Sequence, residues 1–491
     1  MSRCLLPLLL LLSACPDDPK PSETGVTDSG EADTDTDTDT DTDSDADTDS
    51  DADTDPIVPA SGFATQSLQW SIPVAGEYDW KVDDSYGRHA VIDMNGDGLP
   101  DFVDTENQNT TGSSDVWTSG GQQYWKVYLN TGSGFAATAT QWNIPVAGEY
   151  DWKVYESYGR HSLMDMDGDG QPDFVDCENQ NTTGSSDVWI SGGQQYWKVY
   201  LNTGSGFAAT ATQWNIPTAG EYDWKVYDSY SRHAVVDMDG DGRPDFVDSE
   251  NQGTTGSSDV WTNGGQQNWR VYLNTGSGFS SSPTQWNIPT AGEYDWKIDD
   301  SYGRHGLVDM DGDGQPDFVD SENQGTTGSS DVWTNDGQQN WRVYLNTGSG
   351  FSSSPTQWNI PTAGEYDWKL YDSYGRHTTY DLDGDGLPDF VDSENQTTAD
   401  SSDVWTSGGG QVWRVYTNTG SGFAASPLSW SVPVAGEYDW KFYDSYSRHA
   451  VLDLTGDGYP DFLDTENQGT PNDSDVWSNG GQQLWKVYPG E

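Results

Sequence analysis

An aspartate-rich motif of nine residues recurs six times in this sequence and constrains its fold more than any other feature. The pattern is Asp-x-Asp/Asn/Thr-Gly-Asp-Gly-x-Pro-Asp, and each copy begins 72 residues after the previous one, from Asp93 to Asp453. All 24 Trp and all six His residues keep the same spacing. The chain is therefore built from six copies of one structural unit that pack against their neighbours.

Each copy contains short alternating runs separated by clusters of Gly, Asn, Asp and Ser, which is typical of strands joined by turns. In the second copy, the pattern predicts strands over residues 160–164, 172–179, 195–202 and 207–214. Four strands per copy is the content of one propeller blade. A further short strand within residues 147–158, around Tyr-Asp-Trp-Lys-Val-Tyr, stays an open alternative.

The two ends of the repeat region complement each other. Residues 62–70 match an outer strand, whereas the last copy stops at Tyr488, after its third strand. Pairing these ends would close a ring and satisfy the edge hydrogen bonds. We therefore predict an all-β fold in which residues 60–491 form a single β-propeller of six four-stranded blades with N- and C-terminal strand closure. An open β-solenoid is the alternative, but its units are shorter.

The first 14 residues predict a signal peptide, with Arg3, an apolar run and small residues before Cys15. The run is too short to span a bilayer. Leu-Ser-Ala-Cys at 12–15 resembles a bacterial lipobox, which implies cleavage before Cys15 and its lipidation. We expect an exported protein, anchored by lipid to the outer membrane or cell surface. An ordinary cleaved signal peptide is the alternative.

Residues 15–59 form a predicted linker, because every odd-numbered residue from Asp33 to Asp55 is Asp and no apolar residue there offers a core. We interpret this segment as a disordered spacer, with a cation store as the alternative. The net charge of −60 excludes nucleic acid as a partner, because phosphate would be repelled.

Cysteine usage gives the repeats no disulfide, because Cys177 is the single cysteine within them. An exported domain without disulfides needs another source of rigidity, and a bound metal is one. Calcium prefers six to eight oxygen ligands, and a Gly at position 6 of such a loop allows its sharp turn. The sequence therefore predicts up to six Ca²⁺ sites.

The predicted ligands are the side chains at motif positions 1, 3, 5 and 9 and the backbone carbonyl at position 7. They are Asp93, Asn95, Asp97, Leu99 and Asp101; Asp165, Asp167, Asp169, Gln171 and Asp173; Asp237, Asp239, Asp241, Arg243 and Asp245; Asp309, Asp311, Asp313, Gln315 and Asp317; Asp381, Asp383, Asp385, Leu387 and Asp389; and Asp453, Thr455, Asp457, Tyr459 and Asp461. Thr455 offers only a hydroxyl, so we expect the sixth loop to bind most weakly.

The same motif is compatible with two alternatives to calcium loops. An EF-hand would need a Glu at position 12 and flanking helices, whereas position 12 is Asp104 and the flanks are predicted strands. Metal-free Asx-type turns are a further alternative, because single Asp-Gly turns are common.

The strings "DMNGDGLPDFVD" and "WKVYLNTGSGF" resemble the FG-GAP/VCBS repeats of integrin-α-like β-propellers, and the resemblance covers residues 62–488. It implies one calcium loop between the first two strands of each blade, in a family of adhesion proteins, lectins and secreted bacterial proteins. Thr455, the long repeat and the Glu-Tyr-Asp-Trp stretch depart from the family pattern.

Six similar surfaces on a long spacer indicate a non-catalytic adhesion or ligand-binding module, monomeric, with a glycan or protein as ligand. Candidate ligand-binding residues are Trp80, Trp117, Trp152 and Trp189, although Trp also fills blade interiors. A structural cell-surface scaffold is the alternative.

A hydrolase is the least favoured function, with the recurring Arg88-His89 pair beside Asp104 and Glu106 as the candidate site. Catalysis needs a unique asymmetric arrangement, and six equivalent copies do not provide one. We therefore predict no enzymatic activity and a structural role for the Arg-His pair.

Overall fold

The computed structural model describes residues 61–74, 81–82, 87–106, 117–145, 153–155, 159–178, 189–218, 225–227, 231–250, 261–289, 297–298, 300, 303–322, 333–362, 369–372, 374–394, 404–434, 441–444, 447–467 and 476–491. The predicted signal peptide, the predicted lipidation site Cys15 and the acidic linker lie outside these residues, as do Trp80 and Trp152. Every regular element in the described part is a strand. It therefore contains no helix that is long and apolar enough to cross a membrane.

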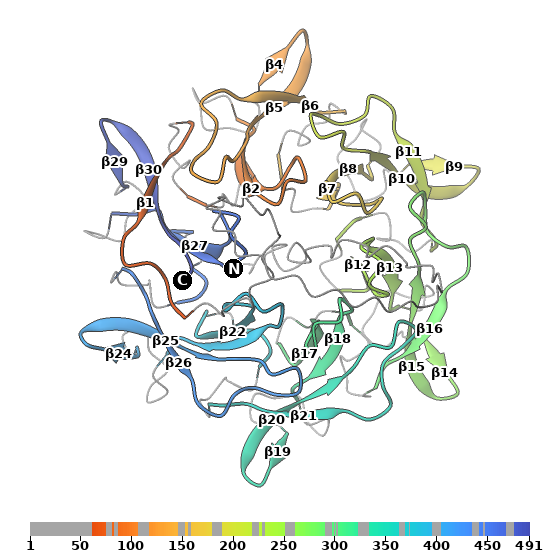
Figure 1. The fold of residues 1–491 in the computed structure, drawn as a ribbon. Coiled ribbons are helices and arrows are strands. Elements are labelled where there is room, and N and C mark those ends of the chain that lie inside the picture. Colours follow the sequence, from red (N-terminus) through yellow and green to blue (C-terminus); the bar gives the residue numbers. More distant parts are fainter. Residues whose placement is uncertain are drawn as a thin grey trace, which may run out of the picture.

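Each repeat folds into one antiparallel sheet, and the six sheets surround a common centre (Figure 1). The first three blades consist of β2 (His89–Ile92), β3 (Asp101–Asp104), β4 (Thr118–Ser119), β5 (Gln122–Tyr128) and β6 (Thr140–Asn143); β7 (His161–Met164), β8 (Asp173–Asp176), β9 (Ile190–Ser191), β10 (Gln194–Tyr200) and β11 (Thr212–Asn215); and β12 (His233–Val236), β13 (Asp245–Asp248), β14 (Thr262–Asn263), β15 (Gln266–Tyr272) and β16 (Thr284–Asn287).

The other three blades repeat this order. They consist of β17 (His305–Val308), β18 (Asp317–Asp320), β19 (Thr334–Asn335), β20 (Gln338–Tyr344) and β21 (Thr356–Asn359); β22 (His377–Tyr380), β23 (Asp389–Asp392), β24 (Thr406–Ser407), β25 (Gly410–Tyr416) and β26 (Leu428–Ser431); and β27 (His449–Leu452), β28 (Asp461–Asp464), β29 (Ser478–Asn479), β30 (Gln482–Tyr488) and β1 (Leu68–Ser71).

The predicted six-bladed propeller with four main strands per blade is confirmed, with two differences in the strands. A two-residue strand such as β9 pairs with the third strand and forms a hairpin at the rim, which was not predicted (Figure 1). The fourth strand, β11, begins five residues later than expected. Phe207 makes only a single bridge with Asn202 and turns its ring onto Trp142 of the preceding blade, at 5.5 Å between ring centroids.

Strand closure also follows the prediction. β1 pairs antiparallel with β30 in the sixth blade, with Leu68 opposite Val487 and Trp70 opposite Trp485. Phe63 extends this pairing through a bridge to Gly490. The open β-solenoid is therefore excluded.

Aromatic contacts between adjacent blades form much of the core. Trp125 of the first blade is fully buried and lies 5.9 Å from the ring of Phe174 in the second blade. The same contact crosses the closure, where Trp485 lies 5.9 Å from Phe102. Because a buried Trp or Phe removes about 150–250 Å² from water, this repeated contact makes a large contribution to ring stability.

The structure describes residues 153–155 of the stretch 147–158, where a further short strand was an alternative. Residues 153–155 are not in a strand, so the structure does not support the extra strand there. Val154 donates its backbone N–H to the carbonyl of Gly87, at 3.0 Å. Gly87 has φ +68°, and an added Cβ would lie 2.6 Å from the Tyr155 carbonyl oxygen, so the close approach between these two blades favours glycine. Ser231 and Ser447 hold the equivalent position in the third and sixth copies, with φ of 55° and 54°.

Candidate metal centre

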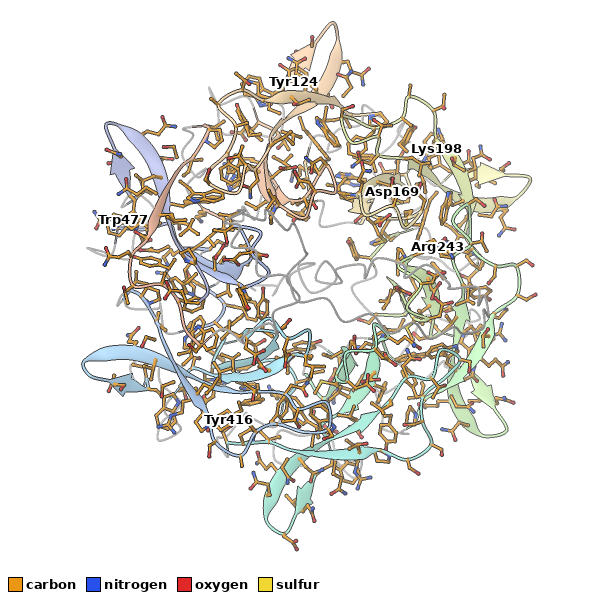
Figure 2. The ribbon with its side chains drawn as sticks, viewed as in Figure 1. Tyr124, Asp169, Lys198, Arg243, Tyr416 and Trp477 are labelled. Atoms are coloured by element: carbon orange, nitrogen blue, oxygen red, sulfur yellow. The ribbon has the colours of Figure 1, made fainter. Side chains whose placement is uncertain are left out.

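The six aspartate-rich loops connect the inner strand of each blade to the second strand, as between β2 and β3. Figure 2 shows Asp169, at position 5 of the second loop, on the inner side of its blade, whereas Lys198 lies nearer the rim. The glycines at positions 4 and 6 have positive φ, +75° for Gly96 and +83° for Gly98 in the first loop. These angles fold the loop tightly enough to gather its carboxylates.

Backbone hydrogen bonds hold the first carboxylate of each loop in place. In the first loop, Asp93 Oδ1 accepts from Gly96 N and its Oδ2 accepts from Gly98 N, both at 2.8 Å. Asp97 Oδ1 accepts from Leu99 N at 2.9 Å. The equivalent bonds recur in the other five loops. Hydrogen bonds from the backbone of each loop therefore fix the positions of its Asp side chains.

The position 9 aspartates are the most deeply buried carboxylates of the loops. Asp101 has no exposed surface; its Oδ2 accepts from Met94 N at 3.1 Å and its Oδ1 accepts from Asn130 N at 2.8 Å. Burial raises the pKa of Asp101 to about 7. At Asp389, burial and the nearby Asp383 raise the pKa to about 8. A buried carboxylate with this environment needs a proton or a cation.

Carboxyl oxygens from three aspartates converge in four of the six loops, within 4.8 Å of one another. The groups are Asp165, Asp167 and Asp173; Asp237, Asp239 and Asp241; Asp309, Asp311 and Asp317; and Asp381, Asp383 and Asp385. In the described part of the chain, one carboxyl oxygen each of Asp167, Asp239 and Asp311 is buried and has no hydrogen-bond partner. Burial also raises the pKa of these three carboxyls.

The remaining loops differ at position 3. Asn95 in the first loop donates its amide to Asp97 Oδ2 at 2.9 Å. In the sixth loop, the Thr455 N–H and hydroxyl both donate to Asp461, at 2.8 and 3.3 Å. That Thr455 weakens the sixth site stays a prediction, but its hydroxyl occupies the position 9 carboxylate, which in the second and fourth loops belongs to the converging group.

The predicted ligand at position 7 is the backbone carbonyl, and the structure shows a further role for the side chain. Each of these residues packs over the position 4 glycine of the preceding loop: an added Cβ on Gly96 would lie 2.8 Å from Gln171 Cγ. The same contact joins Gly456 of the sixth loop to Leu99 of the first. Successive loops therefore touch all the way round the ring. Sequence reasoning missed this contact because its partners are one repeat apart.

Arg243, at position 7 of the third loop, adds a positive charge to its own loop. Its guanidinium forms an ion pair with Asp241, at position 5 of the same loop. The side chains are about one-third exposed, 32% and 31%, so the pair lies at the surface.

The two described candidates for ligand binding, Trp117 and Trp189, lie at the base of the rim hairpins and are half-buried. Lys126 Nζ lies 3.4 Å from the centroid of the Trp117 ring, and Tyr124 stacks beside it at 6.4 Å. Lys198 covers Trp189 at 3.4 Å. A sugar that stacked on these faces would have to displace a lysine.

The Arg-His pair lies at the opposite end of the inner strand. His89 is buried, stacks on Phe102 with ring centroids 5.5 Å apart, and has its Nε2 2.8 Å from the Lys81 carbonyl. Arg88 Nε lies 3.9 Å from Glu106. In the fourth blade, Arg304 forms a two-pronged pair with the buried Asp300, at 2.5 and 2.8 Å.

Comparisons with known proteins add little beyond this geometry. No model of a known protein family matches the sequence, and no curated protein sequence matches it. The FG-GAP/VCBS resemblance therefore stays a prediction.

Solved structures with some similarity include a Tc holotoxin pore from Photorhabdus luminescens, with TM-score 0.47, 16% identity, and coverage of 87% of this chain and 15% of the toxin chain. An Agrocybe aegerita lectin that recognises non-reducing terminal N-acetylglucosamine gives TM-score 0.38 and 18% identity, covering 82% and 85%. An exotype rhamnogalacturonan lyase gives TM-score 0.32 and 12% identity, covering 86% and 75%. The chain thus spans a small part of the toxin, and these low scores support no functional conclusion.

Proposed function

We propose that this protein is a calcium-binding β-propeller in which up to six ions, one per loop, stabilise the ring. The supporting observation is the buried, unpartnered carboxyl oxygen of Asp167, Asp239 and Asp311 beside two further aspartates of the same loop. Leaving a buried carboxylate oxygen without a partner is costly, and a cation at the centre of the group would satisfy it.

The donor set suits calcium better than a transition metal. Every predicted side-chain ligand offers a hard oxygen, and neither Cys nor His belongs to the loops. The alternative of metal-free Asx turns accounts for the bonds that Asp93 and Asp97 accept from the backbone. It does not account for the orphaned oxygens at position 3.

The direct test is metal counting on the chelated full chain after calcium is added back, together with calorimetric titration. We expect four to six ions, the lower count corresponding to the four groups that contain three converging aspartates. Asp167→Asn with Asp169→Asn should remove one ion. A chain that binds no calcium at millimolar concentration refutes the proposal.

We further propose that the propeller serves as a non-catalytic, lipid-anchored module for a glycan or protein ligand. Its six repeated rim hairpins would present equivalent surfaces to a multivalent ligand, and simultaneous contacts raise the overall affinity. The His side chains are buried and stacked on Phe rings, which supports a structural role for them.

Binding of the calcium-loaded protein to immobilised glycans, and separately to cell-surface proteins, tests this module. Sugar-dependent binding that Trp117→Ala and Trp189→Ala weaken would support glycan recognition. A stoichiometric partner without sugar dependence would favour the scaffold alternative. Acyl labelling with Cys15→Ser as control tests the anchor.

A further inference from the structure

A second set of residues links each acidic loop to the next one, and it lies outside the ligands proposed above. In five blades, an asparagine follows the third strand, in the sequence Leu-Asn-Thr-Gly-Ser-Gly or its variant. These residues are Asn130, Asn202, Asn274, Asn346 and Asn418, and each is at least 95% buried.

Each asparagine contacts two loops at once. The backbone N–H of Asn202 donates to Asp173 Oδ1, at position 9 of its own loop, at 2.8 Å. Its side-chain amide donates at 2.8 Å to the carbonyl of Met94, at position 2 of the preceding loop, and at 3.0 Å to the Pro172 carbonyl. Both amide hydrogens are thereby used, so Asn202 is fixed between the two loops.

The bonds of successive asparagines join end to end. Met94, which accepts from Asn202, donates its own N–H to Asp101, at position 9 of the first loop. A continuous path thus runs from Asp101 through Met94 and Asn202 to Asp173. The equivalent bonds extend it through Asn274, Asn346 and Asn418, and Asn130 connects the sixth loop to the first through Leu454.

The path is interrupted at one place. In the sixth blade, Gly490 occupies the asparagine position; its N–H donates to Asp461 Oδ1 at 3.3 Å, but it has no side-chain amide to reach Leu382 of the fifth loop. The linked order is therefore six, one, two, three, four, five. The sixth blade also shows that glycine keeps the backbone bond while it removes the bridge.

We propose that these bridging asparagines couple calcium binding between neighbouring loops, so that the ions bind cooperatively along this linked order. The inference rests on the proposed calcium function. An ion fixes the position 9 aspartate and the loop around it, and this holds the backbone that the next asparagine must contact. An ordered loop therefore lowers the cost of ordering its neighbour, which is the requirement for coupling between sites.

Calcium titration of the chelated full chain tests the coupling. We expect a Hill coefficient above 1 for the wild type. Asn274→Gly should lower the Hill coefficient, because it divides the linked loops into two groups of three while the backbone bond to Asp245 remains. Asn130→Gly is the matched control: it isolates only the sixth loop, so five loops stay linked and the loss is smaller.

A double-mutant cycle separates coupling from a local effect on the third loop. In a chain whose second loop is disabled by Asp165→Asn and Asp167→Asn, Asn274→Gly should leave the affinity of the third loop unchanged. With the second loop intact, the same substitution should weaken the third site about fivefold or more, the lower range of couplings between sites. An equal loss in both backgrounds would overturn the coupling.

The outcomes distinguish this inference from the function on which it rests. Absence of bound calcium removes the proposed function. Calcium binding with a Hill coefficient of 1 in the wild type leaves that function intact and overturns only the coupling. This wild-type result decides the question even if Asn274→Gly fails to fold.

Discussion

Aspartates are buried at both ends of the inner strands, but their pKa values shift in opposite directions. At the end that bears the Arg-His pair, Asp300 is buried against Arg304; burial alone would raise its pKa, but the hydrogen bonds and charge of Arg304 outweigh burial and lower the pKa. At the loop end, Asp173 is equally buried beside other aspartates, and burial raises its pKa to about 7. The charge that arginine supplies to Asp300 is therefore absent beside Asp173, and there a bound cation would supply it.

Removing calcium should have the largest effect, and it should act on the loop end alone. At millimolar calcium, sites with affinities typical of extracellular modules add about 0.5–2 kcal/mol each. Four to six sites then contribute several kcal/mol, a large fraction of the stability of a domain. Calorimetry with calcium and after chelation measures this as a fall in melting temperature. An unchanged melting temperature would contradict the structural role of the ions.

Breaking an arginine pair at the opposite end should cost less than removing all the ions. Arg376→Leu leaves the buried Asp372 without the guanidinium that now lies 2.6 and 2.8 Å from it. Loss of one partner of a buried pair costs about 3–5 kcal/mol. Urea denaturation should show the same loss with calcium and with a chelator. A loss that appeared only with calcium would link the two ends and contradict their independence.

The same contrast predicts a pH dependence for the calcium-free protein. The folded-state pKa values of Asp101, Asp173 and their equivalents are raised to about 7, and that of Asp389 to about 8, so their protonation stabilises the fold. That contribution is fully present below the ordinary pKa of about 3.8 and is lost as the pH rises through 7. The chelated protein should therefore unfold at lower urea concentration at pH 8 than at pH 5.

Calcium should reverse this trend at pH 8 and have less effect at pH 5, where protons compete for the same carboxylates. The arginine-paired aspartates behave oppositely. Their pKa values are lowered, so their contribution is present above about 3.8 and lost at lower pH. Equal chelator sensitivity at pH 5 and pH 8 would show that the loop carboxylates do not bind the ion.

Much of this architecture could be predicted from the sequence because it is periodic. The spacing of the Asp motif gave six blades, and the spare strand before Trp70 gave the closure. Contacts between repeats could not be predicted in the same way. Asn202 recurs as regularly as the aspartates, but only the fold brings it to Met94 of another blade. The one signal in the sequence that set this asparagine apart was its replacement by Gly490 in the last copy.

The geometry of the loop ligands also could not be predicted from the sequence. The motif indicated that position 3 differs at Thr455, but it did not indicate which hydrogen bonds Asn95 and Thr455 make within their loops. Side-chain direction at position 7 depends on the neighbouring blade, and a pattern within one repeat contains no information on it.

The smallest effect is expected from Arg243, which places an arginine at the loop end of the third blade. Arg243→Gln gives the third loop the same nine residues as the second and fourth loops. The change frees Asp241 for the ion, and since a surface pair is worth about 0.2–1 kcal/mol, the affinity of the third site should rise by up to about fivefold.

The reciprocal change, Gln171→Arg, should weaken the second site by a similar factor, and titration calorimetry of both variants against the wild type measures the two shifts. If both substitutions weaken binding, the arginine contributes through its packing on the glycine of the preceding loop rather than through its charge.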